Sequence, residues 1–138
     1  MNPPEMRRPI FWNPGKGKVL CGATFKLEES DTLGKFSLYE ASFKPGKGPK
    51  LHVHEYQDEC FMILEGQFEF FVDGESFQAT AGSTIFIPMN TPHRFVNTGQ
   101  TIGRFYNVLS PGPRHARGVS TEKEWELFLQ TQKEMNQE

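Results

Sequence analysis

The sequence lacks most of the features that would assign it to a membrane, secreted or nucleic-acid-binding class. Its two cysteines, Cys21 and Cys60, are far apart and form no CxxC motif, so neither a disulfide framework nor a cysteine metal site is indicated. No apolar run approaches the roughly 20 residues of a membrane span. The formal net charge of −2 gives no reason to expect nucleic acid or an anionic membrane as a partner.

The chain begins with MNPPEMRRPIFW, which has prolines and charges where a secretory signal has an apolar segment. We therefore expect a cytoplasmic protein, and we interpret both cysteines as packing residues. A length of 138 residues allows one domain of ordinary size. Thirteen phenylalanines supply large apolar side chains, so this domain can bury a compact core.

Short apolar runs separated by turn residues fill the middle of the chain, a pattern typical of an all-β sandwich or barrel. The clearest turn is Asp73-Gly74, because Asp-Gly tolerates the positive φ angles of a two-residue hairpin loop. The predicted strands are Val19–Lys26, Phe36–Phe43, Leu51–His54, Glu59–Leu64, Gln67–Val72, Glu75–Ala79, Thr84–Ile87, His93–Asn97 and Gly103–Leu109.

Three regions are predicted: an N-terminal arm over residues 1–18, a β-barrel domain over 19–112, and a loop with a helix over 113–138. The helix is expected over residues 121–135. Thr121 and Glu124 form a capping-box pattern, and Trp125, Phe128 and Leu129 recur at helical spacing. This helix either covers part of the barrel or contacts a partner subunit.

The stretch LHVHEYQDEC at residues 51–60 carries the first candidate site residues. In a strand, alternate side chains share a face, so His52 and His54 would point the same way and could grip one metal ion. Glu59 begins the next apolar run, and a hairpin at this point could bring its carboxylate to the same ion. A third histidine, His93, opens a strand after the turn residues Asn90-Thr91-Pro92.

These residues resemble the two motifs of the cupin superfamily. The first motif is matched by Gly46, His52, His54, Glu59 and Gly66 with the family's spacing. The second motif is matched by Gly82, Pro88, His93 and Asn97. The one departure is Asn90, where the family usually has glycine. Since Asn best replaces glycine at a left-handed position, this departure is mild.

The resemblance implies a cupin double-stranded β-helix, that is, a jelly-roll barrel, here with a short C-terminal helix. It also implies one divalent metal ion, either Fe, Mn, Ni, Cu or Zn, held by His52, His54, Glu59 and His93. The wider frame is similar to small single-domain cupins grouped with quercetin dioxygenase. In that enzyme the ligand glutamate accepts a proton from the substrate, so Glu59 would be the catalytic residue.

A substrate pocket is predicted beside the metal. Phe61 and Ile63 share parity with Glu59, and Phe95 shares parity with His93, so these side chains should face the barrel interior. Tyr106, on a later strand, is assigned to the same pocket. This set indicates either a cavity for an aromatic or flat substrate or ordinary barrel filling. His115 lies in a loop rich in glycine and proline and is predicted to be a surface histidine.

Three classes of function stay open. The first is a metal-dependent dioxygenase that acts on a small organic substrate. The second is a metal-dependent isomerase, decarboxylase or lyase, and the third is a small-molecule-binding cupin without turnover. We also expect a homodimer, in which residues 7–12 could add an exchanged edge strand to a neighbour's sheet.

Overall fold

The computed structural model describes residues 7–20 and 22–114, together with residues 123, 126, 127, 130 and 133. In this part of the chain a 3₁₀ helix, η1 (Glu29–Thr32), lies between the second and third strands. The strands are β1 (Lys18–Leu20), β2 (Ala23–Leu27), β3 (Ser37–Phe43), β4 (Asp58–Glu65), β5 (Gln67–Val72), β6 (Glu75–Thr80), β7 (Thr84–Ile87), β8 (His93–Asn97) and β9 (Gly103–Ser110).

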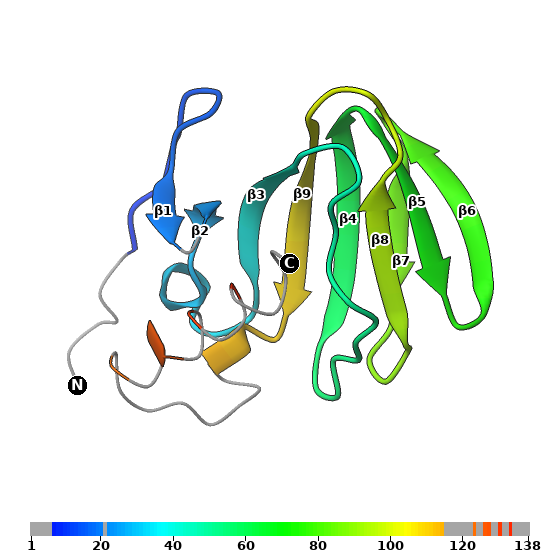
Figure 1. The fold of residues 1–138 in the computed structure, drawn as a ribbon. Coiled ribbons are helices and arrows are strands. Elements are labelled where there is room, and N and C mark those ends of the chain that lie inside the picture. Colours follow the sequence, from blue (N-terminus) through cyan, green and yellow to red (C-terminus); the bar gives the residue numbers. More distant parts are fainter. Residues whose placement is uncertain are drawn as a thin grey trace, which may run out of the picture.

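The strands form two antiparallel sheets, which confirms the predicted all-β jelly-roll class. The larger sheet has the order β1-β2-β3-β9-β4-β7, and the smaller one has the order β6-β5-β8. Figure 1 shows β3, β9 and β4 side by side, with β5, β6 and β8 grouped at one side of them. Neighbours such as β3 and β9 are distant in sequence, so the barrel depends on long-range pairing.

The core lies between the inner faces of the two sheets. It consists of inward-facing residues of strands β4 to β9, as expected for sheets with one buried face. The buried cluster contains Phe61, Ile63, Phe68, Phe70, Ala79, Ile85, Ile87, Phe95 and Phe105. Each fully buried phenylalanine contributes roughly 1.5–3 kcal/mol relative to an exposed one. Edge-to-face ring contacts, such as Phe95 with Phe105 at 5.2 Å between centroids, add to this.

Two predicted strands differ in the structure. The single strand expected over Val19–Lys26 is a hairpin of β1 and β2, in which Leu20 pairs with Ala23. Gly22 has a φ of 83°, a conformation that glycine adopts without strain and that breaks a strand. The strand expected over Leu51–His54 is absent, because only the isolated bridge of His52 with His93 forms there.

Two predicted left-handed positions are confirmed. Asp73 and Gly74 have φ angles of 48° and 82°, as a type I′ hairpin turn requires. They join β5 to β6 in the register Val72 with Glu75. Asn90 has a φ of 65°, which explains why asparagine is accepted at the motif position that usually holds glycine.

The predicted C-terminal helix falls mainly outside the described residues. Residues 123, 126, 127, 130 and 133 are helical, whereas Trp125, Phe128, Leu129 and His115 are not described. The same applies to Cys21. Cys60 is a free cysteine of intermediate exposure rather than a fully buried one. Within the described residues no helix is both long and apolar enough to cross a membrane.

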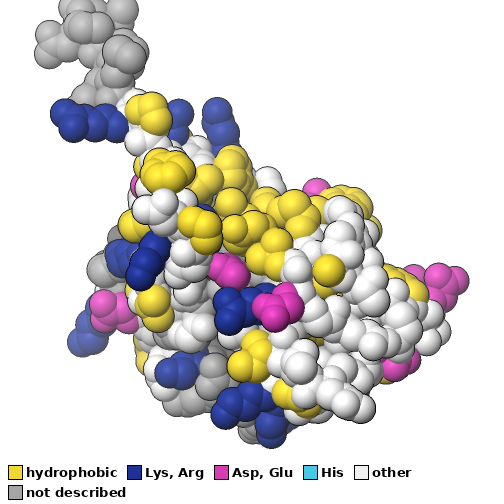
Figure 2. Space-filling view, turned by 90° about the horizontal axis from the view of Figure 1, so that it is seen from above, with side chains coloured by type: hydrophobic (Ala, Val, Ile, Leu, Met, Phe, Trp, Pro, Cys, Tyr) yellow, Lys and Arg dark blue, Asp and Glu magenta, His cyan; other side chains and the backbone are white. Residues whose placement is uncertain are grey.

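Hydrophobic side chains gather on one end of the barrel, the end seen from above in Figure 2. This end carries the last residues of β4 and the first residues of β9. Leu64 and Ile102, which are 40% and 45% exposed, are located there. None of the described histidines is visible on this face (Figure 2), so the histidine cluster lies elsewhere on the barrel.

Candidate metal centre

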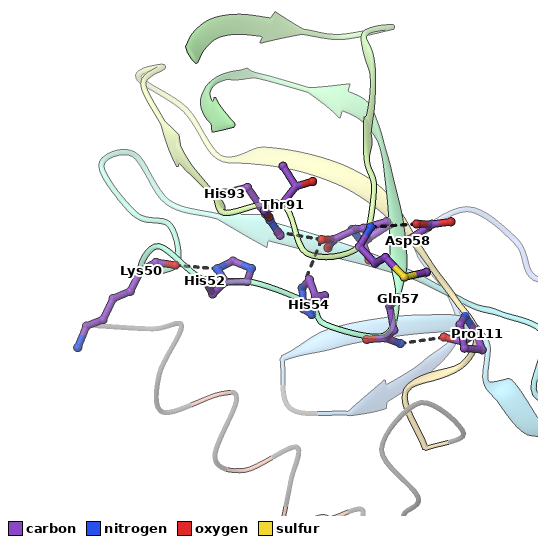
Figure 3. A network of polar contacts seen from close by, with 11 residues as sticks. Lys50, His52, His54, Gln57, Asp58, Thr91, His93 and Pro111 are labelled. Atoms are coloured by element: carbon purple, nitrogen blue, oxygen red, sulfur yellow. Dashed lines mark hydrogen bonds and ion pairs between the residues drawn. The ribbon is translucent and has the colours of Figure 1, made fainter. Parts of the chain in front are cut away.

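The four predicted ligands meet at one end of the barrel, where the chain enters β4 and β8. Glu59 is the second residue of β4, and His93 is the first residue of β8. His52 and His54 lie on the segment between β3 and β4 and point toward them (Figure 3). One ligand-type atom from each of these residues lies within 4.8 Å of the others. The structure therefore brings together all four residues that the motifs indicated.

Backbone hydrogen bonds hold the histidine segment in place. His52 and His93 exchange two bonds, of 3.0 Å and 2.9 Å between nitrogen and oxygen. The N–H of Asn90 donates to the carbonyl of His54 at 2.8 Å. The segment thus lies against β8 and its preceding loop without being a regular strand, and the two side chains still reach the same point.

Two of the imidazole rings are oriented by carbonyl groups of the main chain. Nδ1 of His52 lies 2.7 Å from the carbonyl oxygen of Lys50, and Nδ1 of His93 lies 2.8 Å from that of Thr91. A carbonyl oxygen only accepts, so Nδ1 carries a hydrogen in both rings, and in a neutral ring Nε2 keeps its lone pair. This arrangement is typical of histidines that bind metal through Nε2.

Glu59 directs one carboxylate oxygen at the histidines. Its Oε2 lies 3.0 Å from Nε2 of His93 and 3.3 Å from Nε2 of His54. Neither contact has hydrogen-bond geometry, so Oε2 and the His93 Nε2 are buried without a hydrogen-bond partner among the described residues. Buried polar atoms are normally satisfied. Three imidazoles and a carboxylate would be satisfied by a divalent transition metal, so the residues fit such an ion.

The close contacts shift the ionisation of the site. Burial would raise the pKa of Glu59, but its contacts with His54 and His93 outweigh burial and lower the pKa to about 2. For His93, burial acts to lower the pKa, yet the contacts with Glu59 and with the Thr91 carbonyl raise it overall. Burial lowers the pKa of His52. Glu59 is therefore ionised and His52 is neutral near pH 7, as metal ligands must be.

Two further buried polar residues lie beside the site, and of these Asn107 was not identified from the sequence. Asn107 on β9 is fully buried, and its Nδ2 donates to Oε1 of Glu59 at 2.8 Å. Gln57 is 3% exposed, and its Nε2 donates to the carbonyl of Pro111 at 2.8 Å, which ties the segment before β4 to the end of β9 (Figure 3). Both alternations of β9 contain apolar residues, so no local pattern in the sequence shows that Asn107 faces inward.

The predicted pocket residues fall into two groups. Phe61, Ile63 and Phe95 do face the barrel interior, where they belong to the packed core. Tyr106 was assigned wrongly: it pairs with Met62, whereas the neighbouring Asn107 pairs with Phe61. Since paired residues share a face, Tyr106 lies on the outer face of the larger sheet.

Two acids near the histidines also differ in their surroundings. Glu55 is exposed, as expected for a loop acid. Asp58, by contrast, accepts a hydrogen bond at Oδ1 from the N–H of Met89 at 3.0 Å. Asp58 therefore connects the start of β4 to the loop before β8 and helps to position both ligand-bearing strands.

Comparison with known proteins points to the same barrel. The family model described as "Cupin domain" matches residues 39–109, which include all four candidate ligands. A solved structure from Thermotoga maritima, described as a predicted oxalate decarboxylase, is 27% identical. It superposes with a TM-score of 0.62 over 64% of this chain and 78% of the other.

Two curated relatives share parts of the sequence. The polyketide synthase CurC of Streptomyces cyaneus is 37% identical over 59% of this chain and 54% of its own length. The quercetin 2,3-dioxygenase of Bacillus subtilis is 31% identical over 79% of this chain and 33% of its own length. The chain thus spans about half of the first relative and a third of the second.

Proposed function

Since the chain belongs to the cupin family, we propose that it is a metal-dependent enzyme of the dioxygenase type that acts on a small, aromatic or otherwise flat organic substrate. The observation that carries this proposal is the cluster of three histidines and one glutamate within 4.8 Å. The buried Oε2 of Glu59 and Nε2 of His93 lack hydrogen-bond partners within the described residues, and one bound ion would satisfy both atoms.

His52, His54, Glu59 and His93 would hold one divalent ion, either Fe, Mn, Ni, Cu or Zn. When bound, such an ion supplies a Lewis acid that lowers the pKa of a substrate hydroxyl and, if redox-active, exchanges electrons with dioxygen. With four protein ligands, such an ion would keep coordination positions open for other ligands.

Glu59 has two proposed roles, as ligand and as proton acceptor. Its pKa of about 2 in the metal-free site suits the ligand role, because the carboxylate stays ionised. A group with such a pKa is a weak base near pH 7. As catalytic residue, Glu59 therefore accepts a proton only from a hydroxyl that is already acidified and lies within hydrogen-bond distance of its carboxylate.

The surroundings of the site favour an apolar substrate. Phe61 and Phe95 pack against each other at 5.4 Å between ring centroids, so the interior side of the site is filled. Exposed apolar side chains lie on the two segments that carry the histidines. They are Leu51, Val53, Tyr56 and Met89, which are between 43% and 65% exposed. Burying part of this apolar surface against an aromatic substrate would be favourable.

A non-oxidative reaction is the second candidate. The similarity to the predicted oxalate decarboxylase of Thermotoga maritima at 27% identity favours a metal-dependent decarboxylase, isomerase or lyase, because the same ligands would serve it without dioxygen. A binding protein without turnover would use the same metal site. Fold alone does not separate these classes, so the reaction must be tested directly.

The test begins with elemental analysis of protein purified without chelator or nickel resin, alongside the His52→Ala variant. We expect about one equivalent of a redox-active metal in the wild-type protein and little in the variant. Oxygen uptake is then measured with a panel of catechols and flavonols. Uptake by the wild-type protein that His52→Ala lacks would support the dioxygenase.

Other results point to the competing functions. Stoichiometric zinc without oxygen uptake, together with conversion of a carboxylate substrate, would support the decarboxylase, isomerase or lyase. Bound metal without conversion of any substrate would favour the binding protein. Equal metal contents in wild-type protein and His52→Ala would contradict the proposed site itself.

A further inference from the structure

Asn107 is a buried polar residue on the inner face of the barrel. It is 0% exposed, and its register partners on the neighbouring strands are Tyr39 and Phe61. Neighbours on both sides restrict the side chain to few rotamers. An apolar residue such as leucine would be the ordinary choice at this position, since β9 otherwise places Phe105 and Leu109 on the same face.

The amide of Asn107 is only half satisfied. Its Nδ2 donates to Oε1 of Glu59 at 2.8 Å, whereas Oδ1 is buried with no hydrogen-bond partner in the described part of the chain. An unsatisfied buried acceptor destabilises the folded state, because it has lost its hydrogen bonds to water. The opposite amide orientation would place Oδ1 against the carboxylate and repel it. A polar group retained at this cost, with its one contact to Glu59, indicates a role at the site rather than in stability.

The hydrogen bond from Asn107 gives the two carboxylate oxygens of Glu59 different surroundings. Oε1 faces Asn107, and Oε2 faces His93 and His54 at 3.0 Å and 3.3 Å. A carboxylate that is free on both oxygens can turn and bind a metal ion through both of them. One that is held at Oε1 offers only Oε2.

We infer that Asn107 is a positioning residue that restricts Glu59 to binding a metal ion through Oε2 alone. This inference rests on the proposed metal site. The consequence concerns the number of open positions: with Oε1 held, a six-coordinate ion keeps two positions for other ligands, and with Oε1 bound it keeps one. Asn107 would thus preserve room for a substrate and dioxygen together.

The experiment titrates cobalt(II) chloride into the metal-free wild-type protein and into Asn107→Leu and Asn107→Ser. Leucine has nearly the same shape but no donor, and serine is polar but too short to reach Glu59. Affinity is measured by calorimetry, and the coordination number is read from the intensity of the visible cobalt absorption. We expect both variants to bind cobalt about 10- to 100-fold more weakly, with a weaker absorption because an added oxygen raises the coordination number.

Asn97→Leu is the matched control. Asn97 is 1% exposed on the same barrel, but its Nδ2 donates to the carbonyls of Phe43 and Thr101, away from the site. Circular dichroism and thermal unfolding of each metal-free variant show whether it is folded. If Asn107→Leu does not fold, Asn107→Ser decides the question. We expect Asn97→Leu to lose stability while the cobalt spectrum stays unchanged.

The outcomes separate this inference from the proposed function. Wild-type affinity and spectrum in the folded Asn107 variants would overturn the role of Asn107 and leave the metal site intact. An equally large change of cobalt affinity and spectrum in Asn97→Leu would also overturn the role of Asn107, because any loss of a buried asparagine would then have the same effect. If wild-type protein and His52→Ala bind cobalt equally weakly, the proposed metal site and this inference both fail.

Discussion

Glu59 is the residue on which the chemistry of the site depends. It is 4% exposed and contacts Asn107 through one oxygen and two histidines through the other. A buried carboxylate is costly unless it is paired and hydrogen-bonded. In the metal-free protein the hydrogen bond from Asn107 satisfies Oε1 and the imidazoles beside Oε2 favour the ionised carboxylate, and a bound ion would satisfy Oε2 as well.

Replacing Glu59 by glutamine should remove most of the bound metal while the barrel stays folded. The side chains have the same shape, but the neutral amide is a far weaker metal ligand than a carboxylate. The core phenylalanines are not altered, so the far-ultraviolet circular dichroism should match the wild type. Elemental analysis measures the metal content. Stoichiometric metal in folded Glu59→Gln would place the site elsewhere.

The metal-free protein should lose stability in acid through Glu59. Its pKa is about 2 in the folded state and 4.5 ordinarily, so its contribution is complete above pH 4.5 and disappears as the pH falls toward 2. The pKa of His93 is raised above 6.5 by the same contact. The contribution of His93 to the unfolding free energy is therefore complete below pH 6.5 and disappears as the pH rises through the raised pKa.

The difference in unfolding free energy between metal-free wild type and Glu59→Gln should therefore be largest between about pH 4.5 and 6.5. Urea unfolding at a series of pH values measures it. We expect the difference to shrink on both sides of this range. Two stability curves that run parallel from pH 3 to pH 8 would contradict the proposed pairing of Glu59 with His93.

At the scale of structural elements, the segment before β4 is as important as the strands. It lies along β8 through backbone hydrogen bonds, of which Gly46 N–H to the Asn97 carbonyl at 2.8 Å and Asn97 N–H to the Lys47 carbonyl at 2.9 Å are the first two. The bridge of His52 with His93 follows. This packing carries the first two histidines to the third.

Gly48 makes that packing possible, so Gly48→Ala should weaken both the fold and the site. A Cβ there would lie 1.9 Å from the carbonyl oxygen of Phe95, and a backbone atom cannot move aside easily. We expect a loss of about 1–3 kcal/mol in unfolding free energy, as for overpacking, and weaker cobalt binding because the His52 segment is displaced.

Urea unfolding and calorimetry of Gly48→Ala measure these two effects. Lys47→Ala is the control, because Lys47 is exposed and the change adds no atom between the segment and β8. Unchanged stability and cobalt affinity in Gly48→Ala would show that the segment does not need this close approach.

At the scale of the whole molecule, several apolar groups remain exposed. Phe11, before β1, is 82% exposed, although Trp12 next to it donates its indole N–H to the Lys26 carbonyl at 2.9 Å. β1 forms an edge of the larger sheet, and an edge strand presents unpaired backbone groups to a further strand. Residues 7–17, which precede β1, are not in a strand.

We predict that the protein is a homodimer in which residues 7–12 contact the neighbouring chain. Light scattering at working concentration should give about twice the chain mass of 15.8 kDa. Phe11→Ser should shift the equilibrium toward the monomer if the arm contributes to the interface. A mass of one chain for the wild-type protein would contradict the prediction.

The sequence by itself determined the ligand set and most of the strands. The two motifs whose resemblance to cupins implies His52, His54, Glu59 and His93 as ligands are each short stretches of sequence, and turn residues such as Asp73-Gly74 act locally as well. The alternation of residues along a strand likewise predicted that Phe61 of β4 and Phe95 of β8 face inward. These signals depend on the conformational preferences of a few neighbouring residues, and such preferences can be inferred from the sequence alone.

The tertiary structure decided what depends on register between distant strands. In β9 both alternations contain apolar residues, so only the pairing of Phe61 with Asn107 shows that Asn107 faces inward and Tyr106 outward. The segment at His52 reads as a strand, but its backbone meets β8 at a single bridge. Which face of β9 is buried, and hence which side chain holds Glu59, follows from long-range pairing that local preferences do not encode.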